Sequence, residues 1–386
     1  MMCPEEYYAA WLCCLVTENV MRKRLVAVFG SPGGVYSASE EELCGIGGLT
    51  GDAARKLASA RDAAFLDRLL TRLEKGGIRF LWHDSEEFPK RLRRIPDAPV
   101  GLFLQGRLPK AEIPAIAIVG TRQSTPYGEF VARQFGQGFA DSGVPVVSGL
   151  ALGIDAAAHK GCLLGEGFPV AVLGSGIGAP YPRNNTVLYR NVTDRGCVIS
   201  EYGPGVPALS HHFPNRNRLI AGLSDGVVVV EAKAKSGTLI TVDRALEQGK
   251  GVYVIPGRVT DQNSIGCNQL IREGAQLVTD PGEVLADLST QRGLPLSSET
   301  EDGSYCFAGG SAGKSPCDKN TKKSLASDEK IVYAFLRLSP KHFDQLVWES
   351  GLTPSELADV LDSMERKGFI ERISAGCYSV KDTDTQ

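Results

Sequence analysis

The sequence has no apolar run of about 18 residues, the length that a membrane-spanning helix needs. Its first residues also lack the basic, then apolar, then small-residue order of a secretory signal peptide. The nearest candidate, residues 9–16, is short and follows Glu5 and Glu6. We therefore expect neither membrane contact nor export.

Cysteine patterns that build metal sites or disulfide frameworks are missing as well. The chain has 10 cysteines, but they are scattered, form no CxxC pair and show no metal-ligand spacing. In a chain without an export signal, such cysteines are typical of reduced cytoplasmic thiols. The sequence therefore predicts a cytoplasmic protein without a metal centre.

Signatures of nucleotide cofactors are also absent. No GxxxxGK[ST] phosphate loop occurs. The nearest approach to a dinucleotide fingerprint, LGSGIGAPYP at 173–182, lacks the GxGxxG spacing. Pro180 and Pro182 would also block the helix that should hold the pyrophosphate. We expect no cofactor.

Titratable side chains form no complete catalytic constellation. Asp155 and His159 stand one helical turn apart, which suits a metal pair, a base with its orienting group, or a structural contact at a helix start. Glu201 and Glu231 end predicted strands, but no nucleophile or metal partner accompanies them. The sequence therefore predicts no catalytic residues.

The charge balance gives no general attraction to nucleic acid, because the formal net charge is −3. Any binding of a polyanion must therefore use a local basic patch. With 386 residues the chain has room for two or three domains, and its 44 glycines indicate many tight turns.

Short apolar runs alternate with amphipathic segments from residue 115 onward. Such alternation predicts an α/β fold: a Rossmann-like, doubly wound, mostly parallel sheet with helices on both faces. The predicted strands are AIAIVG (115–120), VPVVSGL (144–150), PVAVLGSG (169–176), CVISEYG (197–203), GVVVVEA (226–232), GVYVIPG (251–257) and AQLVTD (275–280).

Small, turn-forming or cationic residues end most of these strands. In a doubly wound sheet, ligands bind beyond the carboxyl ends of the strands. Several glycines on one edge indicate a shallow surface that another backbone can approach closely. The ends are Gly120-Thr121-Arg122, Ser148-Gly149-Leu150, Gly174-Ser175-Gly176, Ser200-Glu201-Tyr202, Glu231-Ala232-Lys233 and Pro256-Gly257-Arg258.

Cations gather around the buried strand 226–232. Arg216 and Arg218 precede it, and Lys233 and Lys235 follow it. This pattern favours a polyanion lying against backbone over acid–base chemistry.

Small residues and one aromatic ring strengthen that interpretation. Ser236-Gly237-Thr238 opens a helix, where free N–H groups favour an anion. Thr121 offers a hydroxyl and a backbone N–H beside Arg122, whose guanidinium can bind a phosphate bidentately. Phe213 can stack on an unpaired base or anchor a loop to the core, and both interpretations stay open.

The region before the sheet divides into two parts. Residues 1–75 predict short helices, with a helix-hairpin-helix-like motif at 41–57 capped near Thr50. Its Gly-rich turn either binds a phosphate or is purely structural. Residues 76–285 predict the Rossmann-like domain with its lead-in. The lead-in carries the basic run 90–94, which either contacts DNA or forms a solvated helix face.

The C-terminal part predicts a linker and a winged helix. Residues 286–325 lose periodicity and fill with polar residues, as in linkers. Residues 326–381 predict three helices and a hairpin, with a capping box at Thr353 and a turn at Gly376. The third helix is acidic, so we expect a protein-contact or regulatory role rather than groove reading.

Seven ordered motifs resemble those of the DNA-processing protein DprA (Smf) family. The resemblance covers the Rossmann-like domain almost throughout and extends more loosely to the N-terminal helical (helix-hairpin-helix/SAM-like) region and the winged helix. The motifs are AIVGTRQSTPYG, SGLALGIDAAAHKG, VLGSGIGAPYPRNN, SEYGPG, HFPNRNRLIAGLS, VVVEAKAKSGTLIT and PGRVTDQNSIGCNQLI.

The resemblance implies a cytoplasmic protein that binds single-stranded DNA and loads RecA recombinase onto it during natural transformation. It also implies a homodimer formed through the Rossmann-like domain, and no catalytic activity. The cation that the family often has three residues before the phenylalanine is Ser210 here. The implied DNA-binding residues are Gly120, Thr121, Arg122, Phe213, Arg216, Asn217, Arg218, Lys235, Ser236 and Gly237.

Two other function classes stay open. A nucleotide-binding Rossmann-like enzyme of the phosphoribohydrolase type uses a PGGxGTxxE signature, and here SGTLIT keeps the Gly-Thr helix start but has Thr241 in place of the acid. A pure interaction scaffold would bind recombinase without affinity for DNA.

Overall fold

The computed structural model describes residues 4–292, 296–297, 306–307, 329, 332–333, 335–336, 341–350, 352–374 and 376–380. The chain divides into two compact units, Met1–Gly310 and Ser311–Gln386. Within the described residues, no helix combines the length and the apolar character that crossing a membrane requires.

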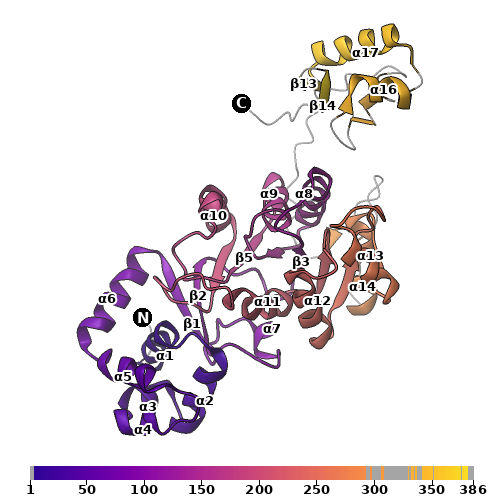
Figure 1. Ribbon diagram of the computed structural model, residues 1–386. Coiled ribbons are helices and arrows are strands. Elements are labelled where there is room, and N and C mark those ends of the chain that lie inside the picture. The colour runs from indigo at the N-terminus through magenta and orange to yellow at the C-terminus, as the bar shows by residue number, and fades with distance from the viewer. Residues whose placement is uncertain are drawn as a thin grey trace. The chain divides into compact units, whose positions relative to one another are not determined.

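One mixed sheet organises the first unit (Figure 1). Its strand order is β1-β2-β6-β5-β4-β3-β7-β8-β9. β1 and β2 are antiparallel additions at one edge, and every pairing from β6 to β9 is parallel. The bounds are β1 Ile78–Trp82, β2 Gly101–Gly106, β3 Ile116–Val119, β4 Val146–Ser148, β5 Pro169–Leu173, β6 Cys197–Ser200, β7 Gly226–Val229, β8 Gly251–Val254 and β9 Gln276–Leu277.

Helices cover both faces of this sheet, as the strand–helix alternation predicts (Figure 1). One face carries α8 Pro126–Asp141, α9 Ile154–Leu164, α10 Thr186–Arg195 and α14 Pro281–Arg292. The other face carries α7 Lys90–Arg93, α11 His212–Leu223, α12 Gly237–Glu247 and α13 Ile265–Arg272. The doubly wound, mostly parallel α/β architecture is therefore confirmed.

Two hydrophobic cores, one on each face, hold these layers together. Alternate residues of the central strands point to opposite faces, so Ala117 and Val227 join one core while Ile118 and Val228 join the other. Because both faces are buried, the strands read as continuous apolar runs rather than alternating ones.

The structure corrects the predicted segment boundaries in three places. The strands end earlier than predicted, since β7 stops at Val229 and the residues after it leave the sheet. Phe213, for which a loop anchor was one interpretation, lies in a helix, because α11 begins at His212. α14 continues to Arg292 with Leu288 buried, so the segment expected to be a linker from residue 286 begins as a helix.

Residues 4–75 form short helices, as predicted. Ser39 and Thr50 cap α4 and α5 and thus bound the helix-hairpin-helix-like segment. The helices are α1 Pro4–Leu15, α2 Asn19–Phe29, α3 Pro32–Ser37, α4 Glu40–Cys44, α5 Gly51–Ser59 and α6 Ala63–Lys75.

The second unit contains the predicted capping box and hairpin. Thr353 accepts from the Glu356 N–H and Glu356 in turn accepts from the Thr353 N–H. Gly376 has φ of 76° at the hairpin turn. The elements are β12 Lys341–His342, α16 Phe343–Ser350, α17 Pro354–Arg366, β13 Ile370–Ser374 and β14 Cys377–Val380. Within the expected linker 286–325, α14 ends at Arg292 and β10 Leu296–Ser297 pairs with β11 Cys306–Phe307; the other residues after 292 lie outside the described part.

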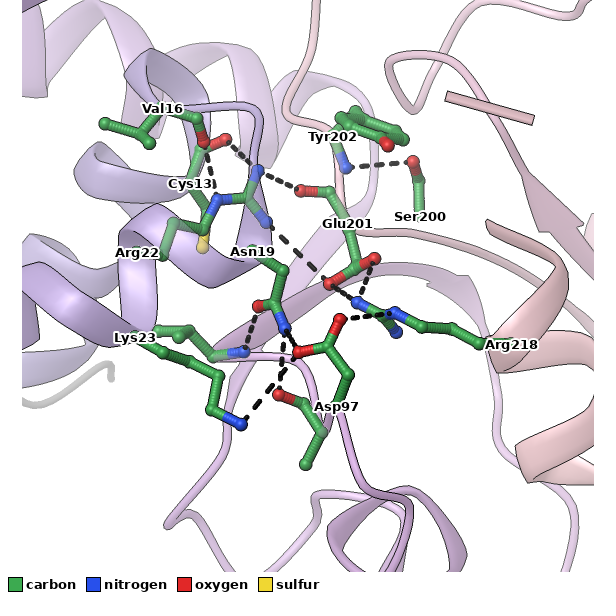
Figure 2. A network of polar contacts seen from close by, with 12 residues as sticks. Cys13, Val16, Asn19, Arg22, Lys23, Asp97, Ser200, Glu201, Tyr202 and Arg218 are labelled. Carbon is green, nitrogen blue, oxygen red and sulfur yellow. Dashed lines mark hydrogen bonds and ion pairs between the residues drawn. The ribbon is translucent and has the colours of Figure 1, made fainter. Parts of the chain in front are cut away.

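A buried ionic network joins the N-terminal helices to the sheet (Figure 2). The Glu201 carboxylate, at the end of β6, accepts two hydrogen bonds from Arg218 Nη2 at 2.7 and 2.8 Å. On the other side of Glu201, Arg22 of α2 donates to the Glu201 and Cys13 carbonyls, both at 3.0 Å. Arg218 Nε also pairs with Asp97 at 3.1 Å. Two buried arginines thus share one carboxylate between three chain segments.

We expect Arg218→Ala to lower the free energy of unfolding by about 3–5 kcal/mol, because it leaves Glu201 buried without its bidentate partner. Lys23→Ala is the matched control, since Lys23 pairs with Asp97 of the same network at 3.9 Å but is 46% exposed. Exposed pairs contribute about 1 kcal/mol or less. Urea unfolding of both variants measures the difference. Equal destabilisation would show that the network does not hold the unit together.

A second buried group, His159 of α9, ties stability to pH. Burial, helped by the Arg216 charge, lowers the pKa of His159 from 6.5 to about 3. The folded state therefore keeps this imidazole neutral while the unfolded chain takes up a proton below pH 6.5. Stability is full above that pH and falls as the pH drops toward 3.

Replacing this histidine should flatten the acid limb of the stability curve. We expect His159→Gln to remove up to about 1.4 kcal/mol per pH unit from the slope of unfolding free energy between pH 6 and pH 4. His83→Gln, whose side chain is 35% exposed, is the control. Urea unfolding across that pH range is the measurement. An unchanged slope in His159→Gln would refute the linkage.

Candidate nucleic-acid interface

The candidate site lies at the carboxyl edge of the sheet, around the central strands β3 and β7. The chain runs outward from β3 through β4, β5 and β6, then returns to β7 on the other side of β3. In doubly wound folds, ligands bind beside such a reversal of strand order. Hydrogen bonds connect the loops there: Gln123 accepts from Lys233 Nζ at 3.0 Å and from Asn263 Nδ2 at 2.8 Å.

An exposed arginine and two aromatic rings meet at this edge. The Arg122 guanidinium carbon lies 4.7 Å from the centroid of the Phe213 ring. The centroid of the Tyr181 ring lies 5.6 Å from that of Phe213, the two rings are tilted by 35°, and Tyr181 is 46% exposed. Arg122 is exposed and Phe213 is half-buried. The three side chains, named here the Arg122 cluster, offer ring faces and a cation on one surface.

Phe213 owes its position to a glycine and to the start of α11. A Cβ on Gly174, just after β5, would meet the Phe213 ring at 2.7 Å, so the glycine allows the ring to lie against the backbone. Phe213 stands in the first turn of α11, so this helix fixes the position of its backbone. The ring packs on the strand end and is half-buried, and its stacking on a base stays a prediction.

Arg216 is the buried support of that helix start. Its Nη1 donates to the carbonyl of Gly149 at 2.8 Å and to the carbonyl of Val172. These carbonyls belong to the ends of β4 and β5, so Arg216 fixes α11 across both strands. Burial lowers the pKa of Arg216 to about 10, while the nearby Asp155 carboxylate raises it.

The structure therefore corrects the expectation that Arg216 and Arg218 present free cations to a ligand. Their relative exposures are 3% and 6%. Arg216 donates to carbonyls under the edge, and Arg218 pairs with Glu201 and Asp97. Both arginines position α11 instead of facing the surface.

Gly120 and Thr121 also have structural roles, one in helix packing and the other in a backbone hydrogen bond. A Cβ on Gly120 would lie 2.6 Å from the Ile154 side chain, so this glycine permits close packing of α9. The Thr121 N–H, expected to be free for a phosphate, donates to the Glu231 carbonyl at 2.9 Å. The Thr121 hydroxyl accepts from the Gln123 N–H at 3.2 Å. Thr121 therefore fixes the loop that carries Arg122.

The start of α12 keeps the predicted features of an anion site. Ser236 stands at the N-cap position, but its side chain makes no cap hydrogen bond, and its Oγ is buried without a partner. Gly237 has open space around its Cα, and Lys235 is exposed. Asn217 Nδ2 donates to the Gly237 carbonyl at 3.3 Å, which ties α11 to this helix start. Lys235, Ser236 and Gly237 thus remain accessible or unsatisfied, while Asn217 positions them.

The carboxylates near this edge serve the backbone. Asp155 accepts from the Gly149 N–H at 3.1 Å, and burial raises its pKa while Arg216 lowers it. Glu231 accepts from the Thr125 N–H at 3.0 Å and from its hydroxyl. Both acids are held by loops at the start of neighbouring helices.

Sequence reasoning missed Tyr181 and the loop residues Gln123 and Asn263. Tyr181 lies between Pro180 and Pro182, in a motif that was weighed as a dinucleotide fingerprint and as part of the family resemblance but not for an aromatic contact. The prolines do prevent a helix there, because α10 begins only at Thr186. The signal for Tyr181 was an aromatic residue in a rigid loop just beyond a strand end.

Two family models match this chain, one in each of its compact units. The family model for DNA recombination-mediator protein A matches residues 79–289, and the model for the DprA winged helix domain matches residues 318–376. The C-terminal winged helix predicted from the sequence therefore has independent support.

Characterised relatives and solved structures carry the same names. The DNA processing protein DprA of Streptococcus pneumoniae is 46% identical over 52% of this chain and 71% of its own length. Its X-ray structure superposes with a TM-score of 0.63, covering 74% of this chain and 99% of that one at 34% identity.

Two further matches extend the comparison. A structure of DNA processing protein A from Helicobacter pylori, described for its single-stranded DNA binding mode, has a TM-score of 0.50 at 28% identity and covers 55% of this chain and 96% of that one. Protein Smf of Synechocystis is 31% identical over 95% of this chain and 96% of its own length. The chain belongs to the DNA recombination-mediator protein A family, known also as DprA or Smf.

Proposed function

We propose that this protein binds single-stranded DNA without sequence specificity at the carboxyl edge of its sheet. The observation that carries the proposal is the Arg122 cluster, in which Phe213 and Tyr181 offer ring faces beside an exposed guanidinium. Stacking on aromatic rings tolerates every base, and a guanidinium binds phosphate, so the pair suits an unpaired strand. The single-stranded DNA binding described for the Helicobacter pylori relative supports this proposal.

The proposed path of the strand continues from the cluster toward α12. Lys235, Ser236 and Gly237 follow β7, next in the sheet to β3, whose end carries Arg122. A phosphate at the uncapped start of α12 would receive backbone N–H groups and the Ser236 hydroxyl. We propose that Arg122, Phe213, Lys235, Ser236 and Gly237 contact the strand directly.

The remaining predicted residues act from beneath the strand in this proposal. Arg216, Arg218 and Asn217 hold α11, while Gly120 and Thr121 hold the Arg122 loop. Substituting them weakens binding by moving the cluster or by unfolding the unit, which explains why the same motif contains both contact and support residues.

We also propose that the bound strand is delivered to RecA recombinase during DNA processing in transformation, and that the protein is a cytoplasmic homodimer formed through its Rossmann-like domain. The family membership supports this role.

Large apolar side chains around β8 and β9 give the domain a surface for a second copy; Val259 is 89% and Leu277 47% exposed. Sedimentation velocity tests the dimer, and a monomer at all concentrations would contradict it.

An enzyme of the phosphoribohydrolase type is the weaker candidate. Its signature requires an acid three residues after Thr238, where Thr241 lies buried at 2% exposure. The nearby Glu231 carboxylate accepts hydrogen bonds from Thr125. We propose binding without catalysis.

Two substitutions in the Arg122 cluster should weaken DNA binding in different ways. We expect Phe213→Ala to cost about 1–3 kcal/mol of affinity for a labelled oligothymidylate, from lost stacking, with an unchanged salt dependence. Arg122→Ala should lower the affinity and also reduce the slope of log K against log salt by about 0.7, because one phosphate contact is lost. Fluorescence anisotropy between 50 and 300 mM salt measures both.

Arg272→Ala is the matched control for charge, since Arg272 is an exposed arginine at the far end of α13. It should leave affinity and slope near those of the parent protein. If Arg122→Ala behaved like Arg272→Ala, or if duplex DNA bound as tightly as the single strand, the assignment of the interface would be wrong.

Delivery of the strand makes a separate prediction. RecA added to oligonucleotide coated with single-strand-binding protein should begin ATP hydrolysis sooner when the parent protein is present, and Arg122→Ala should lose this effect. A parent protein that binds DNA but never shortens the lag would contradict the recombinase role while leaving the DNA interface intact.

A further inference from the structure

A large cavity opens at the amino edge of the sheet, opposite the Arg122 cluster. It measures about 1080 Å³ and is lined by Ala115, Asp225 and Lys250, each of which directly precedes a parallel strand (β3, β7 or β8). The α7 region and the loop after β2 form its other walls. The cavity is therefore separated from the Arg122 cluster by the length of the strands.

Cations outnumber acids in this cavity once the lining acids that form ion pairs, and their partners, are set aside. Glu87 pairs with Arg79 at 2.7 Å, Glu247 with Arg244 at 2.6 Å and Asp225 with Arg91 at 3.1 Å. Only Glu86 and Glu112 remain among the lining acids. Within the described residues, the lining cations for which no ion pair occurs are Lys90, Arg94, Arg107, Lys110 and Lys250.

Lys250 lies in the wall of this cavity among other cations. It is half-buried, and its ammonium makes no hydrogen bond or ion pair within the described residues. Burial lowers its pKa, and the charges of Arg91 and Arg94 lower it further, with no acid acting in the other direction. Neighbouring cations do not stabilise the charge of Lys250, so this side chain attracts an anion.

The fold already uses two of the four cations in the basic run. Arg91 donates to the Ile113 carbonyl at 2.7 Å, and Arg93 donates to the His83 carbonyl at 2.9 Å. Lys90 and Arg94 stay exposed and point to the same cavity lining. The sequence left two alternatives for this run, a DNA contact or a solvated helix face. In the structure the run divides, because Arg91 and Arg93 bind backbone carbonyls while Lys90 and Arg94 are exposed.

The cavity also has an apolar floor. Phe88, Ile95, Val147, Val170 and Ile199 line it, and all of them are buried core residues. Its volume is that of a site for one small molecule, and such sites combine apolar walls with a few placed charges. A nucleic-acid strand needs an open groove instead, so the concave shape favours a single organic anion.

We propose that this amino-edge cavity binds a phosphate-bearing small molecule of nucleotide size, with its phosphates at Lys250 and Arg94 and its ring against the apolar floor. The site is distinct from the DNA interface and does not depend on it.

Isothermal titration calorimetry of the full chain with ADP, inorganic phosphate and adenosine tests this site. We expect ADP to bind more tightly than either fragment, because only ADP engages both the cations and the floor. Lys250→Met and Arg94→Met should each weaken ADP binding by about tenfold, since each removes one charge-assisted contact. Lys160→Met, an exposed lysine of α9, is the control and should bind as the parent does.

The same variants distinguish the phosphate of a small molecule from the phosphate of a DNA backbone. Thermal unfolding midpoints of both cavity variants should match the parent, and their oligonucleotide affinity should stay unchanged. No ADP heat at millimolar concentration, or equal ADP binding in Lys250→Met and Lys160→Met, would overturn the proposal. So would a loss of oligonucleotide binding in the cavity variants without any ADP binding, which would assign the cations to a DNA backbone instead.

Discussion

The buried arginines of α11 determine where every other part of the candidate interface lies. Arg216 crosses the carboxyl ends of β4 and β5 by donating to their carbonyls, and Arg218 reaches the other way to Glu201 and Asp97. A buried guanidinium is costly unless its donors are used, so each arginine accepts only a narrow range of helix positions. That constraint holds Phe213, in the first turn of the same helix, against Gly174 and beside Arg122.

Sequence patterns predicted the sheet well because burial on both faces leaves continuous apolar runs, and each predicted strand is present. They predicted α11 poorly. HHFPNRNR has two histidines, a proline and two arginines, a composition typical of a loop, and its helix is stabilised by partners distant in sequence such as Glu201 and Asp97. The same limit explains why Arg216 and Arg218 were expected at the surface. Charged residues are rarely buried unless paired, and the pairing acids cannot be identified without the fold.

The two edges of the sheet differ in how their charged side chains are paired. At the carboxyl edge, the buried acids Asp155 and Glu231 accept hydrogen bonds from loop N–H groups, while the cations Arg122 and Lys235 are exposed. At the amino edge, Asp225 pairs with Arg91 of the cavity wall, and no ion pair within the described residues involves Lys250 or Arg94. The net charge of −3 reveals neither group of cations, because the local pairing of charges, and not their sum over the chain, decides which cations are available to an anion.

The contact between Arg122 and Phe213 also affects how a strand can enter. In the free protein the guanidinium covers one face of the ring at 4.7 Å, a cation–π arrangement of modest energy at an exposed site. In the proposed binding mode, a base that stacks on that face displaces Arg122 and frees its guanidinium for a phosphate contact. Because the released contact is weak and both proposed contacts ignore base identity, the exchange would favour an unpaired nucleotide over a paired one, whose ring faces are already stacked. A preference for single strands would then come from these two side chains and would require no reading of sequence.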